Sequence, residues 1–159
     1  MATHDSVDYI DWHEAKQVTP SQLEAVHQND MVIERAKPRD FLEIARLDRE
    51  AWAQSRNSKY IPDGEHAWRL WTEYALVFCA WEEDRLLGAV LAFSTLQPDL
   101  FCLHKVFVDH ASRGKGIGSA LFDAMFVECD QRGVDCFLTV DPVNESAIRL
   151  YENWGVTER

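Results

Sequence analysis

The residues best suited to chemistry lie in the stretch Phe101–Phe122, where a glycine-rich turn follows an apolar strand pattern. Gly114, Gly116 and Gly118 alternate with other residues directly after Arg113. Glycines at a strand-to-helix turn let backbone N–H groups approach a ligand where a Cβ would clash. The N-terminus of the following helix adds donors without helical partners and a partial positive charge. This pattern predicts a site for a phosphate or pyrophosphate group, the alternative being a tight turn without a ligand.

The spacing of these glycines separates three kinds of phosphate-binding loop. A Walker loop requires GxxxxGK followed by Ser or Thr, and the sequence has no such string. A dinucleotide fingerprint requires GxGxxG, whereas the glycines here follow GxGxG. Both observations disfavour a nucleotide-binding protein. What remains is the pattern R-x-x-G-x-G, written RGKGIG, after a strand that ends Val106-Phe107-Val108.

A second motif lies downstream, in Asn144–Gly155, which reads NESAIRLYENWG. It fits the pattern N-x-x-A-x-x-L-Y-x-x-x-G. With these two motifs in this order, the chain resembles the GNAT superfamily of N-acetyltransferases over roughly residues 31–155. The resemblance implies an acyltransferase that moves an acetyl group from acetyl-CoA to a primary amine, on a small molecule, a protein N-terminus or a lysine.

The resemblance also assigns residues to the cofactor. The backbone of Val106, Phe107 and Val108 would pair with the pantetheine arm. Backbone amides would hold the pyrophosphate, with cationic help from Arg113 or Lys115; the amides are those of Gly114, Lys115, Gly116, Ile117, Gly118 and Ser119. Asn144 matches the family's cofactor-binding Asn, and by residue type it also suits the N-cap of the last helix.

Two residues are predicted to move protons. Tyr151 matches the family Tyr that acts as general acid for the coenzyme A thiolate, a role that a tyrosine hydroxyl suits by its basicity. Its alternative role is aromatic packing near Trp154.

The general base is less clearly marked. A sub-group that acts on protein N-termini has a Glu where this chain has Thr139, which cannot serve as a base. His104 is the best alternative, because an imidazole takes up protons near neutral pH. A water relay to a carboxylate stays open. If the strand alternates regularly, Cys102, His104 and Val106 share one face and Lys105 and Phe107 the other. Without a base, the protein would be a catalytically silent acyl-CoA-binding or regulatory module.

Composition excludes several other classes of protein. A chain of 159 residues suits one domain. It has no apolar run of 18 residues and a polar, acidic start, so neither a membrane span nor a secretory signal is expected. The net charge of −11 argues against a nucleic-acid partner. The cysteines and histidines fit no metal-ligand spacing, so no metal is expected, and the cytoplasm is the expected location.

Hydrophobic periodicity predicts an α/β fold with a mixed (α+β) sheet. Strands are expected at residues 31–36, 76–81, 86–95, 101–108 and 134–140, and helices at 39–54, 65–74, 116–131 and 144–153. This order gives antiparallel strands first and a βαβ crossover second, with helices on both faces, as in the GNAT fold. Residues 31–159 are expected to form this acetyltransferase domain, and residues 1–30 an acidic N-terminal extension with a short helix at 20–28.

The last strands of the family fold have no counterpart before Arg159, which leaves the strand at 134–140 as an unpaired edge. The N-terminal extension, a second copy in a homodimer, or further residues of a longer chain would cover it. In the family, the region between residues 39 and 74 shapes the acceptor pocket. Trp52, Tyr60, Trp68 and Trp71 are therefore candidates for its lining, with core packing as the alternative for each.

Overall fold

The computed structural model of the chain describes residues 31–54, 61–139 and 145–153. The helix expected at 20–28, Tyr60, and Asn144 lie outside these ranges. The five strands are β1 (Met31–Arg35), β2 (Leu76–Glu82), β3 (Arg85–Ser94), β4 (Leu100–Val108) and β5 (Asp135–Leu138). The helices are α3 (Phe41–Gln54), α4 (Glu65–Tyr74), α5 (Ile117–Arg132) and α6 (Glu145–Asn153), with short 3-10 turns η1 (Pro38–Asp40) and η2 (His110–Ser112).

The strands form one mixed sheet in the order β1-β2-β3-β4-β5. The first three pairings are antiparallel, and β4 pairs with β5 in parallel after the crossover through α5. The predicted order and fold class are confirmed. The last strand, β5, is shorter than the predicted range 134–140. It begins at Asp135 and ends at Leu138.

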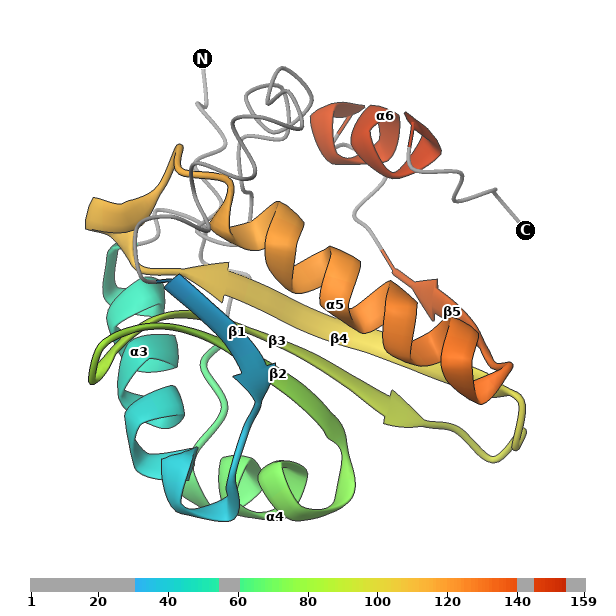
Figure 1. Cartoon of the computed structure of the whole chain (residues 1–159), viewed down its shortest axis with the longest axis horizontal. Coiled ribbons are helices and arrows are strands. Elements are labelled where there is room, and N and C mark those ends of the chain that lie inside the picture. The colour runs from blue at the N-terminus through green and yellow to red at the C-terminus, as the bar shows by residue number, and fades with distance from the viewer. Residues whose placement is uncertain (1–30, 55–60, 140–144, 154–159) are drawn as a thin grey trace.

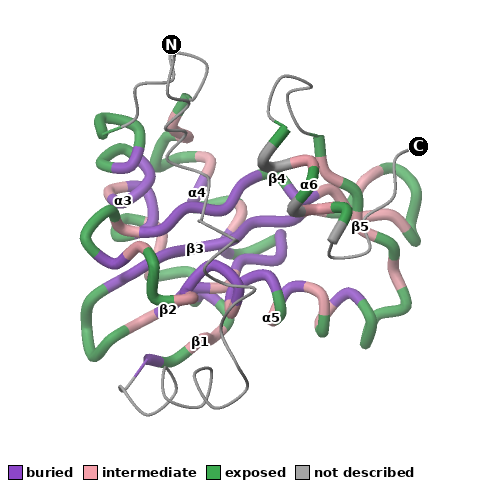
Figure 2. Tube along the Cα trace, turned by 90° about the horizontal axis from the view of Figure 1, so that it is seen from above, coloured by how far each residue is buried: buried purple, intermediate pink, exposed green. Residues whose placement is uncertain are grey.

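Helices cover both faces of this sheet (Figure 1). We call the side packed against α5 the α5 face and the opposite side the α3/α4 face. Each face has its own buried cluster, and Figure 2 shows the purple, buried segments running along the central strands between the two helical layers. Phe122, Leu121 and Met125 anchor the cluster on the α5 face, and Trp68, Ile44 and Leu47 anchor the other.

The hairpin between β2 and β3 approaches its neighbours closely at Gly88. A Cβ built there would lie 2.8 Å from the backbone oxygen of Phe107, closer than real Cβ atoms come. The pairing passes from Ala80↔Gly88 to Trp81↔Leu86, so β3 carries one extra residue beside this glycine. A glycine inside a strand is typical of a bulge or of a close backbone approach, and Gly88 has both.

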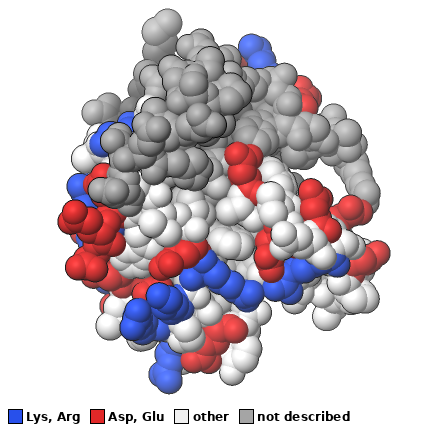
Figure 3. Space-filling view, in the orientation of Figure 1, with Lys and Arg blue, Asp and Glu red and all other residues white. Residues whose placement is uncertain are grey.

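Several surface charges are paired with a neighbour of opposite sign. In Figure 3, a band of Lys and Arg side chains is bordered on both sides by Asp and Glu. Arg46 bonds to Glu43 and Glu50 along α3, and these hydrogen bonds raise the pKa of its guanidinium. Exposed pairs of this kind contribute little to stability, so the packing of the two buried clusters holds the fold.

Candidate active site

The glycine-rich turn opens α5 in the conformation that the sequence pattern requires. Gly114 and Gly116 have φ angles of 76° and 75°, in the left-handed region that favours glycine. A Cβ added to Gly116 would meet nothing within 4 Å in the part of the chain that the structure describes. The Ala120 N–H bonds to the Gly116 carbonyl at 3.1 Å, and the amides before it belong to the unbonded first turn of the helix.

Ser119 supplies an independent sign of a ligand at this turn. The residue is only 4% exposed, and its Oγ has no hydrogen-bond partner among the described residues. A buried hydroxyl without a partner is unfavourable, which suits it to a ligand oxygen. The turn therefore fits a phosphate or pyrophosphate group. Ile117 and Gly118 are buried and offer only backbone amides, Arg113 is half-buried, and Lys115 is exposed.

The strand before the turn presents an open backbone edge. Pairing between β4 and β5 covers Leu100–Leu103 and Asp135–Leu138 and goes no further. On that side, Val106, Phe107 and Val108 have no strand partner within the described part of the chain. Their side chains are buried, two toward the α5 face and that of Phe107 toward the α3/α4 face. Only their backbone groups are available, which is the way an extended ligand arm is bound.

His104 is the extra residue of a β-bulge. The register passes from Leu91↔Lys105 to Ala92↔Leu103, so His104 has no partner on β3. A bulge places two successive side chains on one side of the sheet. His104 therefore contacts residues of the α3/α4 face, as Lys105 does, while Val106 packs on the α5 face. The sequence placed His104 on the face of Val106 only if the strand alternates regularly, and the bulge breaks that alternation.

The His104 imidazole is held by an acidic and two aromatic neighbours. Its Nε2 lies 3.2 Å from Oδ2 of Asp63. Its ring centroid is 5.4 Å from that of Trp71 on α4 and 5.7 Å from that of Phe93 on β3. The side chain is 37% exposed, so the imidazole is both held and accessible to a small molecule.

A buried ionic network stands behind this histidine. The Nζ of Lys105 lies 2.7 Å from Oδ2 of Asp63 and 3.1 Å from Oδ2 of Asp48, and the Asp48 side chain is fully buried. Asp48 also accepts hydrogen bonds of 2.9 Å from Nε1 of Trp68 and from the backbone N–H of Asp63. Since each charge has a partner of opposite sign and further hydrogen bonds, the network meets the conditions that make buried ions tolerable.

The aromatic candidates divide between core and site. Trp68 is fully buried against Phe107 and Asp48, so it belongs to the core. Trp71 lies against His104 and is positioned to line an acceptor site, whereas Trp52 is 46% exposed on α3. Tyr151 on α6 is partly buried on the α5 face, with its ring 6.4 Å from that of Phe122. Tyr151 thus has the packing contact of its alternative role.

Sequence reasoning missed Asp48, Asp63 and Lys105. Two of them carry a signal in hindsight. Asp48 occupies a core position in the apolar stripe of α3, and Lys105 lies inside an apolar strand. A charge at a core position requires a partner of opposite sign, so each of the two residues indicates that the other lies close to it in the fold. Asp63, in the segment before α4, gave no such signal.

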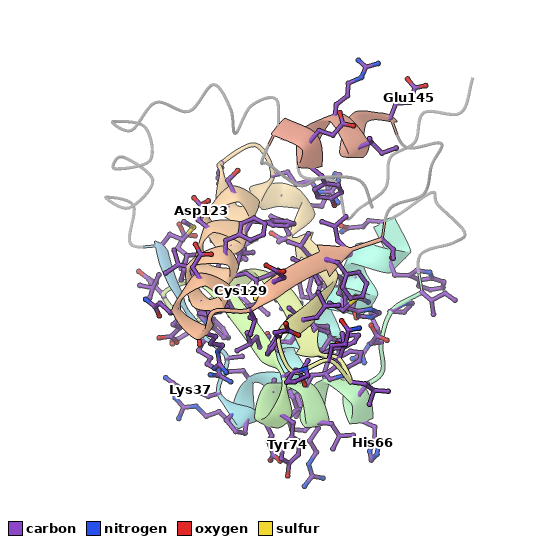
Figure 4. The ribbon with its side chains drawn as sticks, turned by 90° about the vertical axis from the view of Figure 1, so that its right-hand side faces the viewer. Lys37, His66, Tyr74, Asp123, Cys129 and Glu145 are labelled. Carbon is purple, nitrogen blue, oxygen red and sulfur yellow. The ribbon has the colours of Figure 1, made fainter. Side chains whose placement is uncertain are left out.

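The described residues contain no group of three potential ligands that could hold a metal ion. Two free thiols interact with each other, those of Cys129 on α5, labelled in Figure 4, and Cys136 on β5. The hydrogen bond between them lowers the pKa of Cys129 and raises that of Cys136. In the described part of the chain, no helix is long and apolar enough to cross a membrane.

The described residues thus form an α/β domain in which a glycine turn follows a strand that pairs with β5 over only part of its length. The family model described as the acetyltransferase (GNAT) family matches residues 41–156. This is more than half of the chain, so the protein belongs to the GNAT family. No curated protein matches the sequence.

Several solved structures share the fold. One is an aminoglycoside acetyltransferase, meta-AAC0020, from an uncultured soil metagenomic sample, at 24% identity and a TM-score of 0.63, covering 82% of this chain and 92% of that one. A ribosomal-protein-alanine N-acetyltransferase from Brucella melitensis biovar Abortus 2308 has 25% identity and a TM-score of 0.63, covering 81% and 93%. The Escherichia coli ribosomal-protein alanine N-acetyltransferase has 24% identity and a TM-score of 0.67, covering 81% and 79%.

Proposed function

We propose that the protein is an acetyl-CoA-dependent N-acetyltransferase that acts on a primary amine. The observation that carries the proposal is the left-handed turn at Gly114 and Gly116, followed by the buried hydroxyl of Ser119, which has no hydrogen-bond partner among the described residues. Membership of the GNAT family supports the same reaction class. Acetyl-CoA would supply the activated acetyl group as a thioester.

The residues of the chain would contribute by binding, orienting and moving protons. The amides from Gly114 to Ser119 would hold the pyrophosphate, with Arg113 and Lys115 adding positive charge. The backbone of Val106–Val108 would align the pantetheine arm along the open edge of β4. This alignment matters because holding the thioester against the amine supplies much of the rate acceleration.

Two side chains would handle the protons of the transfer. His104 would take the proton from the attacking amine, whose nitrogen forms a bond to the acetyl carbon as the carbon–sulfur bond breaks. Tyr151 would donate the phenolic proton to the departing thiolate. Asn144 remains part of the proposed cofactor site by its match to the family motif.

The proposal is tested first by calorimetry with acetyl-CoA, on the wild type and on Gly116→Glu. The substitution adds bulk and negative charge where the pyrophosphate should lie, and we expect it to abolish binding. Gly133→Glu is the matched control, because Gly133 has a φ of 63° at the other end of the same helix and equally open surroundings. Equal loss in both variants, or no binding to the wild type, would contradict the proposal.

The acceptor is tested by coenzyme A release with two kinds of amine. Solved relatives by fold are named for aminoglycosides and for ribosomal-protein alanine, so an aminoglycoside and a peptide that begins with alanine are the first candidates. Release with either supports an enzyme. Tight binding of acetyl-CoA without release over a broad amine panel would favour the silent binding module instead.

The remaining proposals concern organisation. We propose that residues 31–159 form the acetyltransferase domain and residues 1–30 an extension, that the enzyme works in the cytoplasm, and that two copies can meet at the β5 edge. Light scattering at high concentration tests the last point, and a monomeric mass would contradict it.

A further inference from the structure

One carboxylate oxygen of Asp63 is shared between two side chains of the β4 bulge. Oδ2 lies 3.2 Å from Nε2 of His104 and 2.7 Å from Nζ of Lys105. The Asp63 side chain is 26% exposed, whereas that of Lys105 is 7% exposed. The carboxylate therefore stands between the accessible histidine and the buried network.

The position of Asp63 is fixed from both its backbone and its side chain. Its N–H donates to Oδ2 of Asp48 at 2.9 Å, and the same Asp48 carboxylate receives Lys105. Lys105 thus ties Asp48 and Asp63 to β4. Because Asp48 is fully buried on α3, the segment before α4 is anchored to the core at this residue.

This arrangement determines which nitrogen of His104 accepts a proton. An ionised carboxylate only accepts hydrogen bonds, so the neutral imidazole must carry its proton on Nε2. The second nitrogen, Nδ1, is then left with a free lone pair. The rings of Trp71 and Phe93 both pack against the imidazole, with centroids 5.4 and 5.7 Å from its own, and they restrict its rotation.

We propose that Asp63 is a positioning residue that holds His104 in the tautomer with the proton on Nε2, so that Nδ1 receives the proton of the acceptor amine. Lys105 and Asp48 keep the Asp63 carboxylate in place. This inference rests on the proposed function, in which His104 is the base.

The first test is independent of activity. Nitrogen-15 NMR of the imidazole nitrogens, with His104 assigned from its absence in His104→Gln, measures the tautomer in the wild type, in Asp63→Asn and in Asp84→Asn. Asp84 is an exposed hairpin residue and serves as the control. We expect the Nε2–H tautomer to dominate in the wild type and in the control, and to lose its dominance in Asp63→Asn. The same tautomer population in all three proteins would overturn the inference.

A second variant guards against misfolding of Asp63→Asn. Asp63→Glu keeps a negative charge beside Lys105, so the total charge of the network is unchanged, and the longer side chain still offers His104 an acceptor. We expect Asp63→Glu to retain more of the Nε2–H tautomer than Asp63→Asn. A tautomer that is lost equally in both variants, or in neither, would contradict a positioning role.

Kinetics then separates this inference from the proposed function. With an amine that the wild type acetylates, Asp63→Asn should lower kcat at least about tenfold with KM nearly unchanged, a part of the effect of a general base. In a His104→Gln background, Asp63→Asn should have no further effect on kcat, because Asp63 acts through His104. Additive losses would overturn the inference while leaving the acetyltransferase proposal intact. If the wild type does not bind acetyl-CoA, the proposed function is wrong. The NMR experiment would still show which tautomer His104 adopts.

Discussion

The two faces of the sheet are stabilised in different ways. On the α5 face, the cluster around Phe122 and Leu121 is built from apolar side chains that fit closely against the strands. The α3/α4 face has a comparable apolar cluster, but it also buries the charges of Asp48 and Lys105. A buried ion pair is rarely more stabilising than apolar packing. Because the buried ion pair lies on the face that holds His104, we infer that this face fixes charged side chains at the site. The α5 face is held by close apolar packing.

The largest expected effect comes from removing the cation of the buried network. Lys105→Met leaves the fully buried Asp48 carboxylate without its ionic partner, and we expect a loss of about 3–5 kcal/mol in the free energy of unfolding. Lys115→Met, at an exposed position, should change it by less than about 0.5 kcal/mol. Urea denaturation measures both variants. A Lys105 variant as stable as the Lys115 variant would remove the distinction between the two faces.

Overpacking tests the close fit on the α5 face. In Gly88→Ala, the new Cβ would lie 2.8 Å from the Phe107 backbone oxygen and 3.2 Å from Cδ1 of Leu121. We expect a loss of about 1–3 kcal/mol in the free energy of unfolding. Gly64→Ala, where nothing lies within 4 Å, is the control and should lose less than about 1 kcal/mol through its N-cap position. Equal denaturation midpoints would show that the sheet yields easily at Gly88.

Alanine at either end of α5 should cause similar backbone strain. Only the substitution at the glycine turn should weaken the binding of acetyl-CoA. Gly116→Ala and Gly133→Ala each place a Cβ on a residue with positive φ in open space, which costs about 1–2 kcal/mol. Thermal or chemical denaturation checks the stability of both. Calorimetry with acetyl-CoA should show weaker binding for Gly116→Ala alone. Weaker binding in both variants would point to a general loosening of α5.

The smallest effect concerns Asp123 on the α5 face, labelled in Figure 4. Desolvation raises the pKa of its carboxyl, so the folded state favours the protonated form. Its contribution to stability is therefore present below the ordinary pKa of an aspartate, about 4, and is lost as the pH rises through the raised value. Because the residue is exposed, Asp123→Asn should gain less than about 0.5 kcal/mol at pH 7. Urea midpoints at pH 3 and pH 7 test this, and a variant that loses stability at pH 7 would contradict it.

The sequence predicted the elements better than it predicted the site. Helix α4 begins and ends where its periodicity indicates, and the mixed sheet follows from the order of the elements. The glycine turn was predictable because a backbone with positive φ favours glycine, and glycine can be recognised in the sequence. The face of His104 was not, because a bulge is a property of pairing between two strands and leaves no trace in β4 alone. Asp63 escaped notice for a related reason, since its partners are 15, 41 and 42 positions away in the chain.

The bulge on β4 separates the side chain at position 104 from the backbone pairing of the sheet. Without His104, the register Ala92↔Leu103 and Leu91↔Lys105 would continue as an uninterrupted ladder, with Leu103 and Lys105 on the faces that they occupy now. The backbone pairing of the sheet thus does not depend on the residue proposed to carry the chemistry. A substitution at position 104 would therefore remove the proposed base while leaving the backbone pairing of β3 and β4 in place.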